Sequence, residues 1–202
     1  MAAANETNID GNQFVNFILQ AYKVKTLPRT GWLKNGISGT NVEHVGDHMW
    51  GASLLPMLLL SGIRDVDVQK VSTLCMIHDM AESIVGDITP HCGVSKEEKA
   101  QRELEAMEKL IADLPSEVGS NLMSLFNEFE AKETTESILA HDIDKLDMVL
   151  QAHCYENENS KCDLSEFYQS VSPLANAENL IEARKRLASV AKSLLAKKMT
   201  SL

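Results

Sequence analysis

The sequence predicts an all-α fold. Aromatic residues make up 5% of the chain, and long runs in which β-branched residues alternate with polar ones are absent. Apolar residues instead recur three and four positions apart along nearly the whole chain, which is the spacing of one helix face. With 202 residues, 44% of them hydrophobic and 24% charged, the chain has the size and composition of one globular domain. We expect residues 1–10 to be disordered and residues 11–202 to form that single domain.

Two helices and a long loop are expected in the first part of the chain. Apolar residues at helical spacing predict a helix over residues 13–24. The stretch 25–41 is rich in glycine, proline and threonine, and is expected to be a long ordered loop. Helical spacing resumes over residues 45–61, where Pro56 is expected to bend or interrupt a second helix.

Glycine and serine mark the ends of the next two helices. A third helix is expected over residues 66–86, because Gly86 is a typical C-terminal stop. The fourth begins at Ser95, where Glu98 three residues later completes the sequence pattern of a capping box. It is expected to end before Pro115, since proline does not fit a helix interior.

Helical spacing continues through the rest of the chain. The remaining helices are expected at residues 117–130, 135–156, 165–171 and 177–198. The last of them is strongly amphipathic. Its apolar stripe is expected to pack on the core while its basic face meets solvent, rather than to bind a membrane.

Charge and cysteine usage narrow the classes of partner. A formal net charge of −10 argues against a broad nucleic-acid interface, because such an interface needs basic residues to displace counterions from phosphates. The apolar stretch ASLLPMLLLSG is too short to span a membrane. MAAANETNID has neither the basic start nor the apolar run of a secretory signal. The charge and the short apolar stretch therefore predict no nucleic-acid or membrane partner. The four cysteines lack metal-binding spacing, so we expect reduced thiols and a cytoplasmic location.

Titratable residues gather at the end of the third expected helix, in HDMAESIVGD. His78 and Asp79 are adjacent, Glu82 follows one turn later, and Asp87 comes directly after a glycine. Carboxylates at this end of a helix meet the negative end of its dipole, and burying them unpaired costs more still. A cation among them would remove both penalties. A lone histidine on an apolar helix, however, is more often a structural residue than a metal ligand.

Two further stretches supply metal-ligating residue types. His44 and His48 are four residues apart and therefore share a helix face. The helix expected over residues 135–156 carries acidic residues in an apolar frame, and Asp144 lies beside its apolar stripe. Acidic residues on such a helix are often only its solvated face, and His141 is more typical of a structural residue than of a fifth ligand.

Taken in order, these residues resemble the signature of the HD-domain phosphohydrolase superfamily. That signature is an isolated histidine, a His-Asp doublet on the next helix and an aspartate on a later helix. The resemblance covers nearly the whole chain and implies an HD-domain helical bundle with a metal site between helices. It implies the metal ligands His48, His78, Asp79 and Asp144. Mixed imidazole and carboxylate ligands suit one octahedral divalent ion, with Co, Mn, Mg, Fe or Zn as candidates.

The longer match HDMAESIVGDITP resembles the branch that contains bacterial 5'-deoxynucleotidases and their eukaryotic HD-domain relatives. This implies that Glu82 and Asp87 belong to the active site. Glu82 is expected to act as general acid/base, and Asp87 to bind the sugar 3'-hydroxyl or to help protonate the leaving oxygen. The substrates implied are deoxyribonucleoside 5'-monophosphates, hydrolysed to the deoxynucleoside and phosphate, and the branch also implies a homodimer.

The same branch uses an arginine and a tryptophan before the second helix to hold the nucleotide. Arg29 and Trp32 match them, although two residues separate them here and they are adjacent in the bacterial pattern. The alternative interpretation is that Trp32 anchors the loop by packing and that Arg29 is solvated. Two other functions also stay open: a phosphohydrolase for another nucleotide or phosphomonoester, and a non-catalytic, metal-stabilised helical interaction module.

Overall fold

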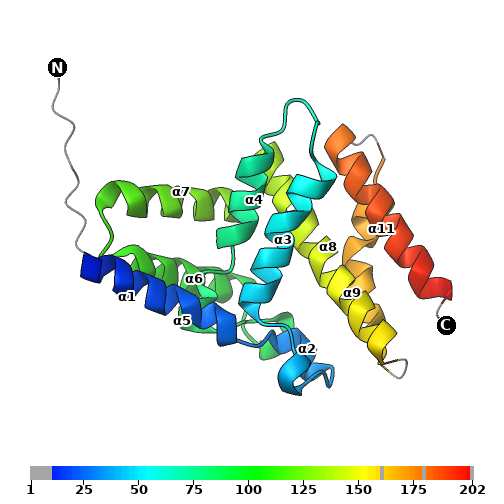
Figure 1. Cartoon of the computed structure of the whole chain (residues 1–202), viewed down its shortest axis with the longest axis horizontal. Coiled ribbons are helices and arrows are strands. Elements are labelled where there is room, and N and C mark those ends of the chain that lie inside the picture. Colours follow the sequence, from blue (N-terminus) through cyan, green and yellow to red (C-terminus); the bar gives the residue numbers. More distant parts are fainter. Residues whose placement is uncertain (1–10, 160–161, 179–180, 201–202) are drawn as a thin grey trace. The chain divides into compact units, whose positions relative to one another are not determined.

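The computed structural model describes residues 11–159, 162–178 and 181–200, and within these ranges the chain is helical with no β-strand (Figure 1). The all-α prediction is therefore confirmed. No helix among the described residues combines the length and the apolar character needed to cross a membrane. The prediction of disorder for residues 1–10 falls outside the described residues.

The chain divides into two compact units. One comprises Met1–Gly46 and Asp79–Phe126, and the other comprises Asp47–His78 and Asn127–Leu202. One boundary falls between His78 and Asp79, so the peptide bond of the His-Asp doublet joins the two units.

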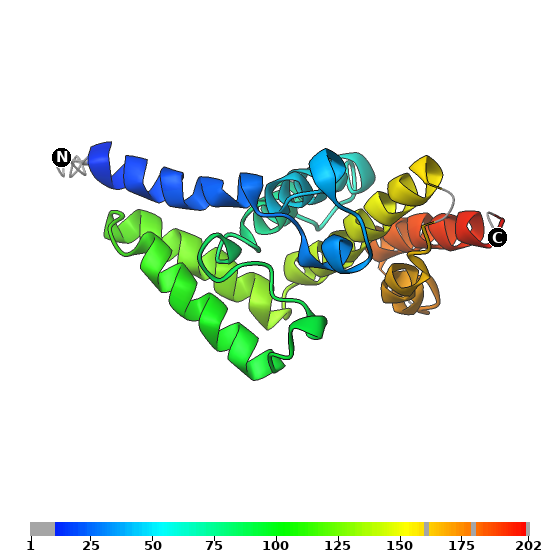
Figure 2. The same ribbon diagram turned by 90° about the horizontal axis from the view of Figure 1, so that it is seen from below.

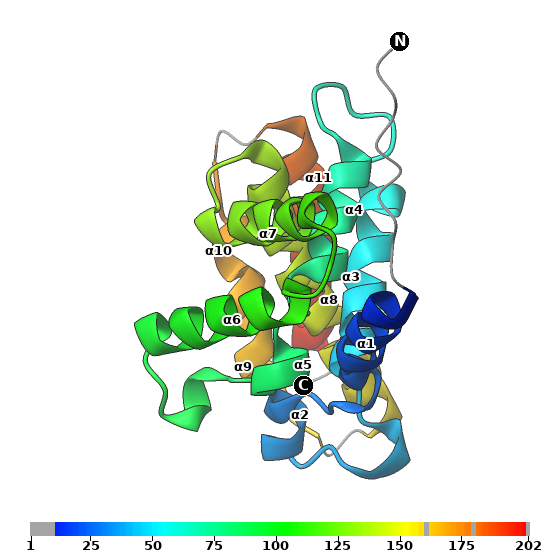
Figure 3. The same ribbon diagram turned by 90° about the vertical axis from the view of Figure 1, so that its left-hand side faces the viewer.

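The first unit is built around a very short helix that carries Glu82. This helix, α5 (Glu82–Val85), lies beside α1 (Gly11–Ala21) and α6 (Lys96–Ile111) (Figure 3). A short connection joins α6 to α7 (Ser116–Ala131) (Figure 2). The remaining elements of this unit are short: η1 (Tyr22–Thr26), α2 (Thr30–Lys34), η2 (Gly39–Asn41) and η3 (Pro90–Cys92).

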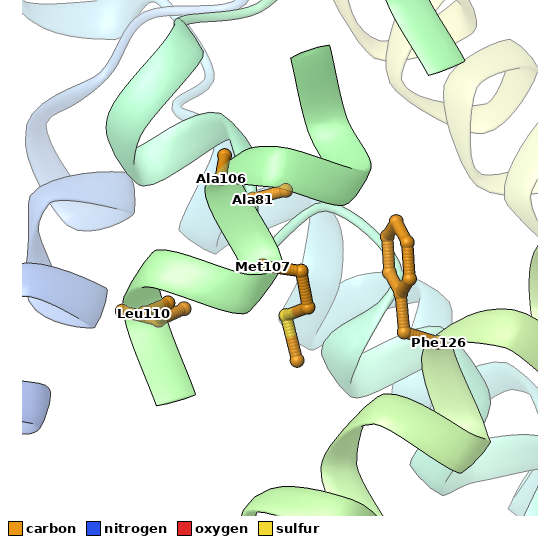
Figure 4. Close-up of a cluster of buried hydrophobic side chains, with 5 residues drawn as sticks. All are labelled: Ala81, Ala106, Met107, Leu110 and Phe126. Atoms are coloured by element: carbon orange, nitrogen blue, oxygen red, sulfur yellow. The ribbon is translucent and has the colours of Figure 1, made fainter. Parts of the chain in front are cut away.

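A buried apolar cluster fixes the turn that precedes α5 (Figure 4). It consists of Ala81, Ala106, Met107, Leu110 and Phe126, each at most 5% exposed. Burying a large apolar side chain contributes roughly 1.5–3 kcal/mol. Because Ala81 directly precedes Glu82, this packing holds the backbone from which the Glu82 side chain projects.

The second unit is centred on the long helix α8 (Thr135–Glu158). It packs against α4 (Val68–Ile77) and α11 (Glu182–Thr200) (Figure 1). The apolar frame of α8 is fully buried at Leu139, Ile143, Leu146 and Val149. The other elements are α3 (Val45–Leu59), most of which belongs to this unit, α9 (Ser165–Tyr168), η4 (Gln169–Val171) and α10 (Ser172–Ala175).

The prediction of one continuous helix over residues 66–86 is wrong, because the helix is interrupted at His78 and Asp79. Helix α4 ends at Ile77, a turn covers residues 78–81, and α5 follows. The ring of His78 contacts the carbonyl oxygen of Cys75 at 2.8 Å. In an unbroken helix that oxygen would accept the amide of Asp79. The side chain therefore competes with the next turn of the helix.

The expectation of a loop over residues 25–41 is also wrong in part, because the one-turn helix α2 lies within it. Two other expectations are confirmed. Ser95 caps α6 by accepting the amide of Glu98 at 3.1 Å, although the Glu98 carboxylate of the expected capping box accepts from Arg102. Gly86 ends α5 with φ +79°, in the region that favours glycine. The chain runs helically through Pro56 to Leu59, so no interruption occurs there.

Candidate functional site

His48 is held in one orientation and one tautomer. It lies on α3 with its side chain fully buried, and its Nδ1 is 2.8 Å from Oδ2 of Asp147 on α8. A carboxylate oxygen accepts hydrogen bonds, so Nδ1 carries the proton in this pair. In a neutral imidazole the lone pair is then on Nε2, which is the state of a metal-ligating histidine.

His78 reaches the same state by a different contact. Its Nδ1 donates to the carbonyl oxygen of Cys75 at 2.8 Å, because a carbonyl oxygen can only accept. The neutral ring again has its lone pair on Nε2. A ring fixed through Nδ1 in this way is the usual arrangement behind a metal-binding histidine.

The two Nε2 atoms meet the carboxylate of Asp144. Its Oδ1 lies 3.1 Å from Nε2 of His48 and 3.9 Å from Nε2 of His78. Ligand atoms of these three residues lie within 4.8 Å of one another. Two lone-pair-bearing atoms 3.1 Å apart repel each other unless a proton or a cation lies between them. The donor set, two imidazole nitrogens and a carboxylate oxygen, therefore fits a divalent metal.

Phe129 packs behind His78. Its ring centroid is 4.9 Å from that of His78 and 4.0 Å from that of His141, on which it stacks. Nε2 of His141 donates to the carbonyl oxygen of Phe129 at 2.8 Å, and burial lowers the pKa of His141. A neutral ring engaged through Nε2 favours the structural interpretation of His141.

Arg29 lies between two carboxylates of the first unit. Its Nη1 is 3.4 Å from Oδ2 of Asp79, and its Nε is 3.9 Å from Oε2 of Glu43. The guanidinium therefore restrains Asp79 and partly neutralises its charge. The sequence did not predict this contact for Arg29. Its side chain is 14% exposed, so Arg29 is not the solvated residue of the alternative interpretation.

Trp32 is an anchor for the segment before α3. Its side chain is 1% exposed, and its Nε1 donates to Oε2 of Glu43 at 2.6 Å. A buried indole needs such a partner for its N–H. This arrangement favours the loop-anchoring interpretation of Trp32 over contact with substrate.

Asp87 holds the start of α2. Its Oδ2 accepts the backbone amide of Thr30 at 2.6 Å, and its own carbonyl oxygen accepts the Thr30 hydroxyl at 2.8 Å. A carboxylate at this position satisfies a helix N-terminal amide, as N-cap residues do. Asp87 therefore joins the residue 29–32 segment to the end of α5.

Glu82 is a buried carboxylic acid of the first unit whose pKa is strongly shifted. It is 3% exposed, and Oε2 lies buried without a hydrogen-bond partner among the described residues. Burial raises the pKa of Glu82 well above its usual range, and the charges of Asp79 and Asp87 add to the rise. A buried carboxyl group with a raised pKa is a typical general acid/base candidate.

Three residues of these clusters were not predicted. Asp147 orients His48, Glu43 holds Trp32, and Lys99 forms an ion pair with Glu103 at 3.4 Å while its charge opposes the rise in the pKa of Glu82. The signal for Asp147 was present in the sequence, because it follows Asp144 by three residues and so shares its helix face. No comparable spacing identified Glu43 or Lys99.

Residues 21–181 match the family model described as HD domain, and the chain belongs to the HD-domain family. The expected family is thus confirmed. Among curated relatives, the chain is 36% identical to the 5'-deoxynucleotidase HDDC2 of Dictyostelium discoideum, an alignment covering 79% of this chain and 88% of the relative. It is 42% identical to the 5'-deoxynucleotidase hdd1 of Schizosaccharomyces pombe, with 72% and 74% covered.

Solved structures agree on the fold. A conserved hypothetical protein from Pyrococcus furiosus is similar with a TM-score of 0.72 and 30% sequence identity, covering 90% of this chain and 99% of that one. The expected HD-domain helical fold is therefore confirmed.

Proposed function

We propose that this protein is a metal-dependent 5'-deoxynucleotidase, which hydrolyses deoxyribonucleoside 5'-monophosphates to the deoxynucleoside and phosphate. One observation carries the proposal: His48, His78 and Asp144 bring three ligand atoms within 4.8 Å of one another, with both rings fixed through Nδ1. The curated relatives named 5'-deoxynucleotidases support the choice of reaction, at identities of 36% and 42%.

In this proposal His48, His78, Asp79 and Asp144 hold one divalent ion, either Co, Mn, Mg, Fe or Zn. Asp79 is included because it completes the His-Asp doublet of the family signature, and Arg29 restrains its carboxylate at 3.4 Å. When bound, the ion supplies positive charge that stabilises the phosphoryl group and makes water more acidic.

Glu82 is the proposed general acid/base. The raised pKa of its buried carboxyl group places proton exchange nearer to neutral pH, where such a group contributes about 10²–10⁴-fold to the rate. Asp87 is proposed to bind the sugar 3'-hydroxyl or to help protonate the leaving oxygen, in addition to holding α2. Arg29 is proposed to pair with the substrate phosphate through its planar donors, with Trp32 fixing the segment that carries it.

The test is phosphate release from deoxyribonucleoside and ribonucleoside 5'-monophosphates with each candidate metal. We expect faster release from the deoxyribonucleotides. Glu82→Gln should keep metal binding and lose about 10²–10⁴-fold in kcat, whereas Asp144→Asn should lose both metal and activity. Equal rates on ribo- and deoxyribonucleotides would remove the deoxy specificity. A fully active Glu82→Gln variant would remove the proposed role of Glu82.

We further propose that residues 11–202 act as one HD domain, that the protein works in the cytoplasm, and that it forms a homodimer. Free cysteines at all four positions support a reducing compartment. The apolar side chains of Trp50, Met57 and Leu58 on α3, each more than 60% exposed, offer a surface for a second copy. Light scattering that returns the mass of one chain would contradict the dimer.

A further inference from the structure

The second unit contains a cavity of about 160 Å³ whose wall carries more positive than negative charge. Its charged lining residues are Lys132, Lys145 and Arg184, with a single carboxylate, Asp142. Such a concentration of cations stands out in a chain with a formal net charge of −10. A concave site lined by one sign of charge concentrates ligands of the opposite sign.

Arg184 is held in place by a carboxylate and keeps hydrogen-bond donors that an anion could use. Asp142 is 8% exposed, and its two oxygens accept from Nε and Nη2 of Arg184 at 2.6 and 3.2 Å. The pair fixes the guanidinium plane, and an arginine has five N–H donors, so donors remain after these two bonds. The single carboxylate of the wall is thus neutralised by one of its three cations.

The two lysines form no ion pair within the described part of the chain. Lys132 follows the end of α7 with φ +53°, an uncommon conformation for a residue other than glycine. Lys145 lies on α8, one turn after Asp142 and therefore on the same face. Both residues line the cavity and carry positive charge that an anion bound there would neutralise.

The cavity is distinct from the metal centre of the same unit. Asp144 is adjacent to Lys145 in sequence, yet successive helix residues point about 100° apart. Asp144 contacts His48 at 3.1 Å, whereas Lys145 lines the cavity with residues of α10 and α11, such as Leu174 and Arg184. An anion in this cavity would therefore occupy a place that the hydrolytic reaction does not use.

We propose that this cavity is a second binding site, which takes the phosphate group of inorganic phosphate or of a phosphomonoester. Arginine offers a planar set of donors that matches phosphate oxygens, and a lysine ammonium adds a point charge, so the three cations of this wall suit a phosphate dianion. A cavity of about 160 Å³ is much larger than the space that one water molecule requires, so it has room for a phosphate group.

The experiment measures binding at equilibrium on the full chain, by calorimetric titration in the presence of a chelator that removes metal from the catalytic centre. The titrants are inorganic phosphate and a deoxyribonucleoside 5'-monophosphate. The test variant is Lys132→Gln/Lys145→Gln. The matched control is Lys185→Gln/Lys192→Gln, which makes the same charge change at two exposed lysines of α11 outside the cavity.

We expect the test variant to weaken phosphate binding at least tenfold and the control to leave it within twofold of wild type. If only the phosphate group is recognised, the nucleotide binds no more tightly than inorganic phosphate; a tighter, lysine-dependent affinity for the nucleotide would identify it as the ligand. Equal losses in test and control variants, or no binding to wild type, would overturn the proposal. The measurement requires no turnover, so its outcome is independent of the proposed deoxynucleotidase activity.

Discussion

At the scale of single residues, the hydrogen bonds that Nδ1 donates decide which ring nitrogen of His48 and of His78 can bind a metal. Asp147 accepts from His48, and the Cys75 carbonyl accepts from His78, each at 2.8 Å. Both contacts leave the ring lone pair on Nε2, where Asp144 is close. The sequence identified the three converging residues, but the residues that orient them are as important for metal affinity.

The protonation of Glu82 provides a test at the same scale. Its pKa is raised above the ordinary value of 4.5, so the folded state holds this proton more tightly than the unfolded state does. The stability that results is present below the ordinary pKa and is lost as pH rises through the raised one. With chelator present, we expect the free energy of unfolding of wild type to fall relative to that of Glu82→Gln as pH rises above about 4.5.

Denaturant unfolding of both proteins across this pH range measures the difference. Lys109→Gln, a single substitution on α6 at an exposed position, serves as a control and should follow wild type. A constant difference between wild type and Glu82→Gln would show that the pKa of Glu82 is not raised in the folded chain.

At the scale of elements, the close approach of α3 to α8 depends on Gly51. A Cβ added at Gly51 would collide with Oδ1 of Asp147, the residue that orients His48. Alanine is otherwise the better helix former by about 1 kcal/mol. We expect Gly51→Ala to weaken metal binding about tenfold, because displacing an orienting carboxylate typically costs 10–100-fold.

Metal titration of Gly51→Ala against wild type checks this prediction. The control is Ser61→Ala, a substitution beyond the end of α3. The neighbouring Ala52 is fully buried, so a substitution there would disturb the core and is not a suitable control. Unchanged metal affinity in Gly51→Ala would mean that Asp147 moves without releasing His48.

Elements also show where helical spacing misleads. The apolar spacing of residues 66–86 continues through His78 and predicts one helix, yet the chain forms α4, a turn and α5. The helix is interrupted because the His78 side chain donates to the Cys75 carbonyl oxygen, in competition with a backbone amide. The spacing of apolar residues contains no information about such a side-chain hydrogen bond. The basic face of the last helix is likewise only partly solvated, since Arg184 pairs with Asp142 on α8.

At the scale of the whole molecule, metal binding should contribute to folding stability. A ligand at 100 times its Kd stabilises the folded state by about 2.7 kcal/mol, because it binds the folded chain alone. For a chain of this size that corresponds to a rise in Tm of roughly 5–10 °C. We expect chelator to lower the Tm by this amount and excess Mn²⁺ or Co²⁺ to restore it.

Asp144→Asn provides the control for this experiment, since it removes one of the proposed ligands. Its Tm should be the same with chelator and with metal. A chelator-induced shift of equal size in this variant would place the stabilising metal elsewhere in the chain.

The sequence by itself determined the helical class, the family and the residues His48, His78 and Asp144, because helical periodicity and a spaced signature are local properties of the chain. The tertiary structure decided what those residues contact. It assigned Asp147 and Cys75 as hydrogen-bond partners, buried Trp32 against Glu43, and set Arg29 beside Asp79. Cys75 and His78 are only three positions apart, but the other pairs join residues from 11 to 99 positions apart. Packing brings such residues together, and no spacing rule within one helix can encode their contact.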